Sequence, residues 1–406
     1  MNSYLNSETP PPIMVGTPPP PEWRVPMIDW DRPPWNRWAF QHMRKLLPTA
    51  PVPRGDHVRP LEEAAAPIEG ITFDTGTGPT TVAEWIDRTY TDGFLVLMDG
   101  RIIHESYWNG MSLGSLHLMQ SVSKSITATA AAPLIEEGLL DPYALVTDVL
   151  PELATTAWAG AKLGQVMDMT SGVRFDESDY ANRMSDIGKM DVASGWKPVP
   201  PGYEHVDWPG SVHDQILSLT TAEAAHGARF EYRSIETDVL AHAMERVTGQ
   251  RLPEIVSDRL WKPLGAEAEA YFTVDPSGYA LACGGFNAGL RDLARFGQLY
   301  LDGGMVAGRQ VIPHAWIADV QGGDHGHFND HGRDYFPNGC YRNQFWIEDR
   351  DRQGHFCLGV FGQCIYVSPE RGMVFVKLST WPEATNPQRM KDTVAAFHAI
   401  AGYFGR

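Results

Sequence analysis

Residues 108–125, WNGMSLGSLHLMQSVSKS, contain two serines that fit different nucleophile motifs. Ser112 is the central residue of Gly110-Met111-Ser112-Leu113-Gly114, which fits the G-x-S-x-G elbow. Ser121 begins a Ser-x-x-Lys sequence that ends at Lys124. The two motifs belong to different folds, because the elbow requires a buried parallel strand that enters a helix through a tight turn. The surrounding sequence must therefore decide which serine is the candidate nucleophile.

The segment before Ser112 indicates an antiparallel hairpin. FLVLMDGRIIHESYW (94–108) contains two β-rich runs joined by Asp99-Gly100, which is a typical two-residue hairpin turn. The strand that leads to Ser112 is therefore expected to be antiparallel, and no HGGG-type oxyanion loop occurs upstream of it. We interpret Ser112 as a loop residue.

Ser121 and Lys124 lie in SVSKSITATAAAPLIEEGLLD (121–141), which predicts a helix that ends near Gly138. Positions i and i+3 share a helix face, so the lysine amine can reach the serine hydroxyl. A second Ser-x-x-Lys sequence, Ser194 to Lys197, contains a glycine and is followed by prolines, which exclude a regular helix. Lysine acts as a base only where its pKa is lowered, and the apolar neighbours of Lys124 predict that burial lowers it.

A third group is needed to carry the proton to the leaving atom, and tyrosine fills this role in Tyr-x-Asn or Tyr-x-Ser elements. Such elements begin at four tyrosines: Tyr107, Tyr180, Tyr232 and Tyr341. We favour Tyr232, because it directly precedes the predicted helix TDVLAHAMERVTG (237–249). It also lies 108 residues after Lys124, a spacing that leaves room for a helical subdomain.

Composition restricts the partners of the chain. Its 406 residues carry a formal net charge of −17, and no basic run is longer than Arg44-Lys45, so neither nucleic acid nor an anionic membrane is an expected partner. No apolar run reaches transmembrane length, and the first residues do not resemble a secretory signal. The four cysteines lack a paired spacing and are expected to be free thiols in the cytoplasm.

The order of the predicted elements favours an α+β fold. A hairpin and a helix are followed by a helical middle, then by three strands in FCLGVFGQCIYVSPERGMVFVKLST (356–380), and by a terminal helix. This order predicts an antiparallel sheet flanked by helices, an α/β sandwich, with an inserted all-helical subdomain. We expect a proline-rich arm over residues 1–60, in which WNRWAFQHMRKLL (35–47) can form one amphipathic helix.

Several long strings resemble the class C β-lactamase-like serine hydrolases and, within them, the nylon-oligomer (6-aminohexanoate-dimer) hydrolases. These strings are PPWNRWAF, YTDGFLVL, LMQSVSKS, YRSIETDVLAHAMERVTG, FTVDPSGYALACGG, RDLARFGQLYLDGG and VKLSTWP. The resemblance implies a serine hydrolase domain over 61–406, with a sheet-containing part at 61–130 and 285–406 and a mainly helical part at 131–284. It also implies an acyl-enzyme that hydrolyses a small linear amide, such as a 6-aminohexanoate-type oligomer.

The resemblance also implies roles for individual residues. Ser121 would be the nucleophile, Lys124 its base and Tyr232 the proton donor to the leaving group. The backbone N–H groups of Ser121 and Val360 would form the oxyanion hole. The substrate would contact four further side chains: Tyr180 on a closing loop, Asp191 at the substrate ammonium, and the aromatic walls Trp196 and Trp346.

The chain departs from the nylon-oligomer hydrolases in the substrate pocket. Phe361 replaces a histidine, Cys283 stands where relatives carry Asn or His, and Thr385 replaces an acidic residue. Val360-Phe361-Gly362 also replaces the Lys-Thr-Gly of β-lactamases and removes the cation that would bind a substrate carboxylate. β-Lactamase and peptidase activities are therefore disfavoured, and a carboxylesterase of the same fold is the main alternative.

Two other interpretations carry less weight. GGDHGHFNDHGRD (322–334) brings His325, His327 and His331 close to Asp324 and Asp330, but we interpret these as solvated loop residues and expect neither a metal nor a cofactor. A non-catalytic sensor or scaffold would have no use for the set of Ser121, Lys124 and Tyr232. The expected partner is a small amide or ester substrate, and the resemblance suggests a homodimer.

Overall fold

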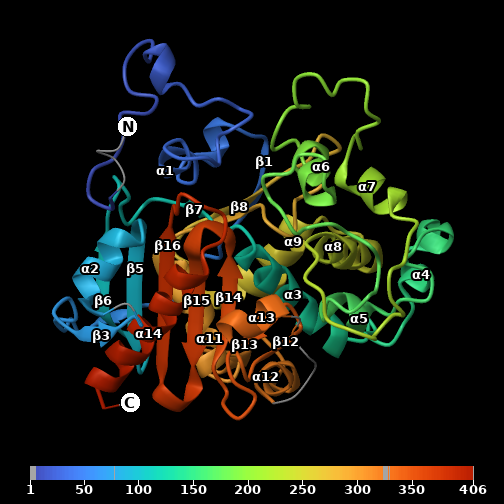
Figure 1. Cartoon of the computed structure of the whole chain (residues 1–406). Coiled ribbons are helices and arrows are strands. Elements are labelled where there is room, and N and C mark those ends of the chain that lie inside the picture. Colours follow the sequence, from blue (N-terminus) through green and yellow to red (C-terminus); the bar gives the residue numbers. More distant parts are fainter. Residues whose placement is uncertain (1–5, 77, 323–327, 329, 406) are drawn as a thin grey trace.

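The computed structural model describes residues 6–76, 78–322, 328 and 330–405 (Figure 1). In this described part, the main sheet has the strand order β12-β13-β14-β15-β16-β5-β6-β2. Its strands are β2 (Glu62–Glu63), β5 (Thr91–Met98), β6 (Arg101–Tyr107), β12 (Cys340–Arg342), β13 (Phe345–Ile347), β14 (His355–Gly359), β15 (Gln363–Ser368) and β16 (Met373–Ser379). Neighbours pair antiparallel except β2, which runs parallel to β6. The predicted antiparallel sheet is confirmed, with one short parallel edge strand added.

The hairpin of β5 and β6 forms as the sequence predicts. Asp99 and Gly100 have φ angles of 48° and 78°, which is the left-handed pair that a tight primed turn requires. Beyond this hairpin, β16 pairs with β5, so that Phe375 lies opposite Val96. The three C-terminal strands therefore continue the sheet that the hairpin begins.

Helices cover both faces of this sheet. α11 (Leu290–Leu301) contacts β15 and β16, and its Gly297 permits the approach, because an added Cβ would lie 2.4 Å from Val374. On the next residue of β16, the ring of Phe375 stacks at 4.6 Å on Phe397 of α14 (Pro387–Tyr403). Since neighbouring residues of a strand point to opposite faces, α11 and α14 cover opposite sides of the sheet, as Figure 1 shows. The sandwich follows from this alternation.

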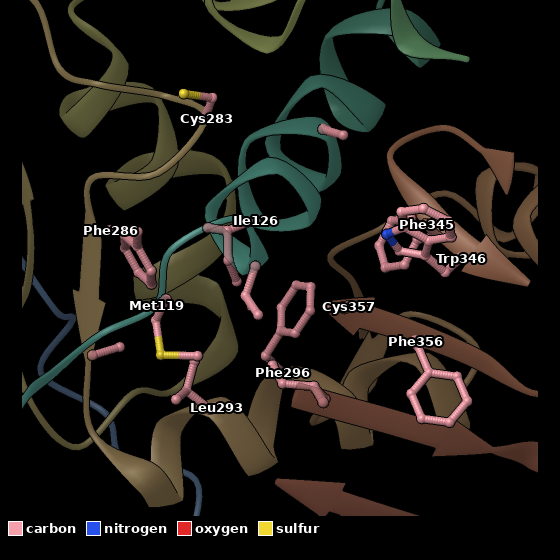
Figure 2. Close-up of a cluster of buried hydrophobic side chains, with 14 of the residues drawn as sticks. Met119, Ile126, Cys283, Phe286, Leu293, Phe296, Phe345, Trp346, Phe356 and Cys357 are labelled. Atoms are coloured by element: carbon pink, nitrogen blue, oxygen red, sulfur yellow. The ribbon is translucent and has the colours of Figure 1, made fainter. Parts of the chain in front are cut away.

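The helical part lies beside the sheet (Figure 1). Its helices are α3 (Val122–Glu136), α4 (Val146–Val149), α5 (Leu163–Met167), α6 (Asp186–Ala193), α7 (Val212–Ser218), α8 (Ile235–Thr248), α9 (Leu252–Val256) and α10 (Lys262–Leu264), with the turns η4 (Pro151–Thr155) and η5 (Ser257–Trp261). α3 is buried nearly all round and contacts α8, α9 and β14. Figure 2 shows Ile126 on this helix, with Cys283 on one side of the helix and Trp346 on the other. None of the described helices combines the length and apolar character needed to span a bilayer.

A second sheet, which the sequence did not predict, holds the start of α3. Its strand order is β1-β8-β9-β7, and every pair is antiparallel. The strands are β1 (Thr49–Val52), β7 (His117–Leu118), β8 (Ala270–Thr273) and β9 (Phe286–Ala288). β8 falls within the region expected to be helical, and β1 comes from the N-terminal arm. Short runs of two to four residues carry little periodicity, so only the folded chain reveals them.

The remaining short elements lie at the periphery. They are η2 (Pro21–Trp23), α2 (Val82–Arg88), β3 (Thr72–Asp74), β4 (Pro79–Thr81), β10 (Met305–Val306), β11 (Arg309–Gln310), α12 (His314–Gln321), α13 (Asp330–Tyr335), η6 (Val360–Gly362) and η7 (Pro369–Arg371).

The N-terminal arm does not form the single helix expected over 35–47. The chain makes α1 (Asn36–Ala39), breaks, and makes the short turn η3 (Met43–Lys45). The break occurs because the carbonyl of Phe40 accepts the N–H of Leu118 from β7 and so leaves the helix pattern. Trp30 is fully buried in the main core, so the arm packs on the body. The domain boundary at residue 60 and the 131–284 unit stay predictions.

Candidate active site

Ser121 occupies a fixed turn between β7 and α3. The preceding residue, Gln120, has a φ of 49°, so the chain turns through the left-handed region just before the serine. The N–H of Met119 donates to the carbonyl of Phe286 at 2.8 Å. Ser123 donates its hydroxyl to the Gln120 carbonyl at 2.6 Å and accepts the Phe286 N–H at 3.0 Å. These bonds fix the turn on β9 and hold Ser121 at the first turn of α3.

Lys124 lies directly against this serine. Its Nζ donates to Ser121 Oγ at 2.8 Å and to the Cys283 carbonyl at 2.8 Å. The same nitrogen lies 5.1 Å from the centre of the Tyr232 ring, and the lysine is 1% exposed. The structure therefore brings Ser121, Lys124 and Tyr232 together.

The expectation that the pKa of Lys124 is lowered is wrong. Burial, the largest influence, lowers this pKa, but the charges available on Tyr232, Cys283 and Glu177 outweigh burial and raise it. Burial in turn raises the pKa of the Tyr232 phenol, against an opposing effect of Lys124. Both shifts favour the protonated forms, and a protonated Lys124 must lose its proton before it can accept one from Ser121.

Trp346 forms the wall behind Tyr232. The two rings stack with centres 5.4 Å apart and an interplanar angle of 26°. Trp346 also packs edge-on against Tyr341 at 5.1 Å and Phe230 at 5.9 Å. This aromatic packing holds Tyr232 in place. Trp346 also lines the second cavity, and its predicted role as a wall of the substrate pocket stays a prediction.

The chain before Val360 approaches the turn that carries Ser121 because residue 359 is glycine. A Cβ on Gly359 would lie 2.6 Å from the Met119 carbonyl oxygen and 3.1 Å from Gln120 Cβ. Phe361, on the other side of Val360, has a φ of 62° and donates its N–H to the Ala384 carbonyl at 2.7 Å. Left-handed residues thus occur next to both predicted oxyanion-hole amides, a kind of strain that is common at active sites.

Two cavities meet at Ser121. The first has a volume of about 340 Å³ and the second about 590 Å³, and both are lined by Ser121, Tyr180, Val360 and Thr385. Further residues of the first cavity include Asp31, Asp191, Trp196, Lys197, Cys283 and Phe361. Further residues of the second include Glu177, Tyr232, Trp346, Leu358, Trp381 and Met390. A substrate can therefore extend to both sides of the serine, and every predicted substrate-binding residue lines one or both cavities.

Tyr180 is held by a carboxylate that the sequence analysis missed. Its hydroxyl donates to Glu177 at 2.7 Å, and burial raises the pKa of the phenol well above its usual value. Glu177 also accepts the backbone N–H of Ser234 at 2.6 Å and its hydroxyl at 2.7 Å. Since Ser234 is 57 residues away, no local pattern could have identified this link between the loop and α8.

Asp191, the predicted ammonium ligand, already contacts a cation of the protein. Lys197 Nζ lies 2.8 Å from the Asp191 carboxylate and 2.7 Å from that of Asp31. Burial raises the pKa of Asp191, while Lys197 opposes that shift. Trp196 closes the same side of the cavity, with its indole N–H donating to Thr273 Oγ1 at 2.9 Å. The amine of Lys197 is therefore engaged by two carboxylates, and we do not interpret the second Ser-x-x-Lys sequence as a nucleophile and base.

Cys283 contributes its backbone to the site as well as its side chain. The loop that carries it is fixed by Asp238, whose carboxylate accepts the Ala282 N–H at 2.8 Å. Burial raises the pKa of Asp238 to about 7 and raises that of the Cys283 thiol well above its usual value. Asp238 was not identified from the sequence, because it looks like an ordinary polar residue of the helix at 237–249.

Other motifs are not brought to this site. Ser112 is exposed and does not line either cavity. Its hydroxyl oxygen lies 3.3 Å from that of Ser115. His325 and His327 lie outside the described residues, and the backbone of His331 lies in α13. Within the residues that the structure does describe, no three His, Cys, Asp or Glu side chains are grouped to hold a metal ion.

Comparison with known proteins places the chain among hydrolases. The β-lactamase family model matches residues 86–400. The chain is 37% identical over 363 residues, covering 88% of this chain and 89% of the relative, to a 6-aminohexanoate-dimer hydrolase of Paenarthrobacter ureafaciens.

Solved structures agree with this match. A Bacillus anthracis protein that was provisionally named a 6-aminohexanoate-dimer hydrolase superposes with a TM-score of 0.85 at 27% identity, covering 96% of this chain and 99% of that one. A family VIII carboxylesterase shares the fold at a TM-score of 0.54 and 14% identity, covering 77% and 93%. The chain therefore belongs to the β-lactamase family and is a serine hydrolase of that family.

Proposed function

We propose that the protein hydrolyses a small linear amide, of the 6-aminohexanoate-oligomer type, through an acyl-enzyme on Ser121. The observation that carries this proposal is the 2.8 Å contact between Lys124 Nζ and Ser121 Oγ, beside the Tyr232 ring and at the junction of two cavities. A nucleophile next to a titratable base, which in turn contacts a third proton-carrying group, is the arrangement that acyl transfer requires.

Acylation follows from the positions of these groups. Ser121 Oγ attacks the substrate carbonyl carbon, and its proton passes to the neutral form of Lys124. Tyr232 delivers a proton to the leaving nitrogen, so that the amine departs neutral and the phenol regains its proton from Lys124. Water then hydrolyses the ester on Ser121 by the reverse proton path. The N–H groups of Ser121 and Val360 stabilise the oxyanion in both steps, an effect worth several kcal/mol in serine hydrolases.

The cavity linings support an amide whose acyl part ends in a cation. The first cavity carries Asp31 and Asp191 around a single buried Lys197, on the side of Ser121 away from Tyr232. Tyr232 lines the second cavity, which also holds both apolar residues, such as Leu358 and Trp381, and charged ones, such as Arg174 and Glu231. A linear ω-amino acyl chain matches the first cavity in charge. The relative from Paenarthrobacter ureafaciens, at 37% identity, bears the name of an enzyme with such a substrate.

A carboxylesterase is the second candidate, and three uncharged residues of the first cavity favour it. Cys283, Phe361 and Thr385 replace the polar residues of the nylon-oligomer hydrolases and leave an apolar surface near the nucleophile. An ester has a better leaving group than an amide and does not depend on protonation of a leaving nitrogen. Both candidate functions proceed through the same acyl-enzyme. They differ in how strongly the reaction depends on Tyr232 and Tyr180, because only the amide requires protonation of a leaving nitrogen.

Intact-mass measurement tests the nucleophile directly. The protein is exposed briefly to a fluorophosphonate and to a p-nitrophenyl ester, and the adduct is located by peptide mapping. We expect the adduct on Ser121, with its loss in Ser121→Ala and its retention in the matched control Ser112→Ala. An adduct on Ser112, or turnover that Ser121→Ala leaves intact, would refute the proposal. Relative kcat/KM values on matched amides and esters then separate the two candidate functions.

A further inference from the structure

The N-terminal arm supplies a carboxylate to the first cavity. Asp31 precedes α1 by five residues and lies with Asp191 and Lys197 on the wall of the cavity that opens at Ser121. Lys197 Nζ contacts both carboxylates, at 2.7 and 2.8 Å. Asp31 is thus far from the nucleophile in sequence but close to the part of the cleft that takes the acyl chain.

The charges of this group do not cancel. Two carboxylates share one ammonium. The same cavity is also lined by one further cation, Arg32, and by two further carboxylates, Asp179 and Glu383, so its lining stays net negative. Lys197 is almost fully buried, with a side chain 3% exposed, so it cannot turn outwards to meet an anionic ligand. Asp31 Oδ1 is buried and has no hydrogen-bond partner among the described residues. A buried carboxylate oxygen without a partner is unfavourable unless a donor from a ligand or water satisfies it.

The arm is fixed firmly enough to position Asp31. The neighbouring Trp30 is fully buried and donates its indole N–H to the Trp196 carbonyl at 2.7 Å. The two indole rings meet edge-on, with centres 5.2 Å apart. One residue earlier in the chain, Asp29 pairs with Arg183 at 2.8 Å. Two anchored residues therefore directly precede Asp31, and its own contact with Lys197 fixes the carboxylate.

We infer that Asp31 is a specificity-determining residue that binds, together with Asp191, the amino end of the acyl part of the substrate. Lys197 offsets the charge of one carboxylate, so that the pair attracts a single ammonium. This inference rests on the proposed acyl-enzyme function and extends the ammonium site from the catalytic body to the arm. It requires a substrate with a primary amine at the far end of an aliphatic acyl chain.

A pair of anilides that differ only in that amine tests the inference. The p-nitroanilides of 6-aminohexanoic acid and hexanoic acid have the same chain length, and their kcat/KM ratio measures recognition of the cation. We expect Asp31→Asn to lower this ratio on the order of tenfold, mainly through KM for the cationic substrate, as loss of one charged hydrogen bond predicts. Asp31→Glu, which keeps the charge, should restore part of the preference.

A matched control and a second variant make the result decisive. Asp56→Asn makes the same substitution at an exposed position of the arm and should leave the ratio unchanged. Asp31→Ser serves if the asparagine variant unfolds. Asp31 variants that are folded, as judged by thermal unfolding, and that keep the wild-type ratio would overturn the inference.

Failure of the proposed function gives a different result. The wild-type protein would then form no adduct on Ser121 with either acyl group. If the wild-type protein forms the adduct but cleaves neither anilide, the p-nitrophenyl esters of 6-aminohexanoic acid and hexanoic acid replace the anilides, and the ratio of their kcat/KM values measures recognition of the cation instead.

Discussion

Glu177→Gln is the substitution that most directly tests how the loop of Tyr180 is held. Glu177 accepts three hydrogen bonds, from the Tyr180 hydroxyl, the Ser234 N–H and the Ser234 hydroxyl, at 2.6–2.7 Å. The glutamine amide has one acceptor oxygen; if it keeps the Ser234 N–H, its NH₂ group faces the Tyr180 and Ser234 hydroxyls, which must then accept instead of donate, and all three bonds lose their assistance by charge. The negative charge at the start of α8 is lost as well.

The structure allows a rough magnitude. Loss of one hydrogen bond to a charged group costs about 1.5–3 kcal/mol, and we take the lower end because Glu177 is half-buried. The helix N-terminus adds about 0.5 kcal/mol. The free energy of unfolding should therefore fall by about 2 kcal/mol. With an unfolding entropy of about 2.1 cal/mol/K per residue over 406 residues, Tm should fall by about 2–3 °C.

Catalysis should change more selectively than stability. Release of Tyr180 from Glu177 should impair amide hydrolysis more than ester hydrolysis, because amide cleavage depends on placing the leaving nitrogen for protonation. The assay is differential scanning calorimetry together with kcat/KM on a matched amide and ester. Asp179→Asn, which removes a carboxylate bonded to Ala181 on the same loop, is the control. An unchanged Tm with an unchanged amide-to-ester ratio would refute the reasoning.

Three further predictions follow from the site and its surroundings. Because the pKa of Lys124 is raised, the rate of Ser121 acylation by a neutral ester should increase with pH from 7 to 9, by up to about tenfold per pH unit. Lys124→Met should abolish acylation. A flat pH profile of the acylation rate in stopped-flow measurements would contradict this prediction. Burial raises the pKa of Glu236 to about 8. Its contribution to stability is therefore complete below pH 4.5 and is lost as pH rises through 8. Glu236→Gln should gain about 4 kcal/mol relative to wild type between pH 5 and 8.5 in urea unfolding, and parallel pH profiles of the two proteins would exclude this effect. Gly359→Ala should place a methyl group 2.6 Å from the Met119 carbonyl oxygen and separate β14 from the turn that carries Ser121. We expect kcat to fall by about 100-fold, as it does when an oxyanion donor is lost. A kcat equal to that of the wild-type protein would show that the turn can adjust.

Local sequence determined the parts of the site that lie on one element. Ser121 and Lys124 share a helix face by their spacing alone, and the structure places Lys124 Nζ 2.8 Å from Ser121 Oγ. Asp99-Gly100 predicted the hairpin because few residues other than glycine and asparagine or aspartate adopt left-handed angles at low cost. In both cases the deciding interactions join residues within a few positions of each other.

Only the tertiary structure decided which distant groups meet these residues. Four Tyr-x-Asn or Tyr-x-Ser elements are equivalent as local patterns, and the position of the Tyr232 ring, 5.1 Å from Lys124 Nζ, distinguishes one of them. The direction of the Lys124 pKa shift depends on Tyr232, Cys283 and Glu177, which come from other segments, so burial alone gave the wrong sign.

The second sheet and the acidic wall of the first cavity have the same origin. β7 and β9 are short strands that pair across more than 160 residues, and Asp31 reaches Lys197 across 166. The periodicity of a sequence reports which face of an element is buried, but it does not report which element covers that face. The local sequence therefore brings the proposed nucleophile and base together, whereas long-range packing positions the proposed oxyanion hole, the proposed proton carrier and the charged residues of the first cavity.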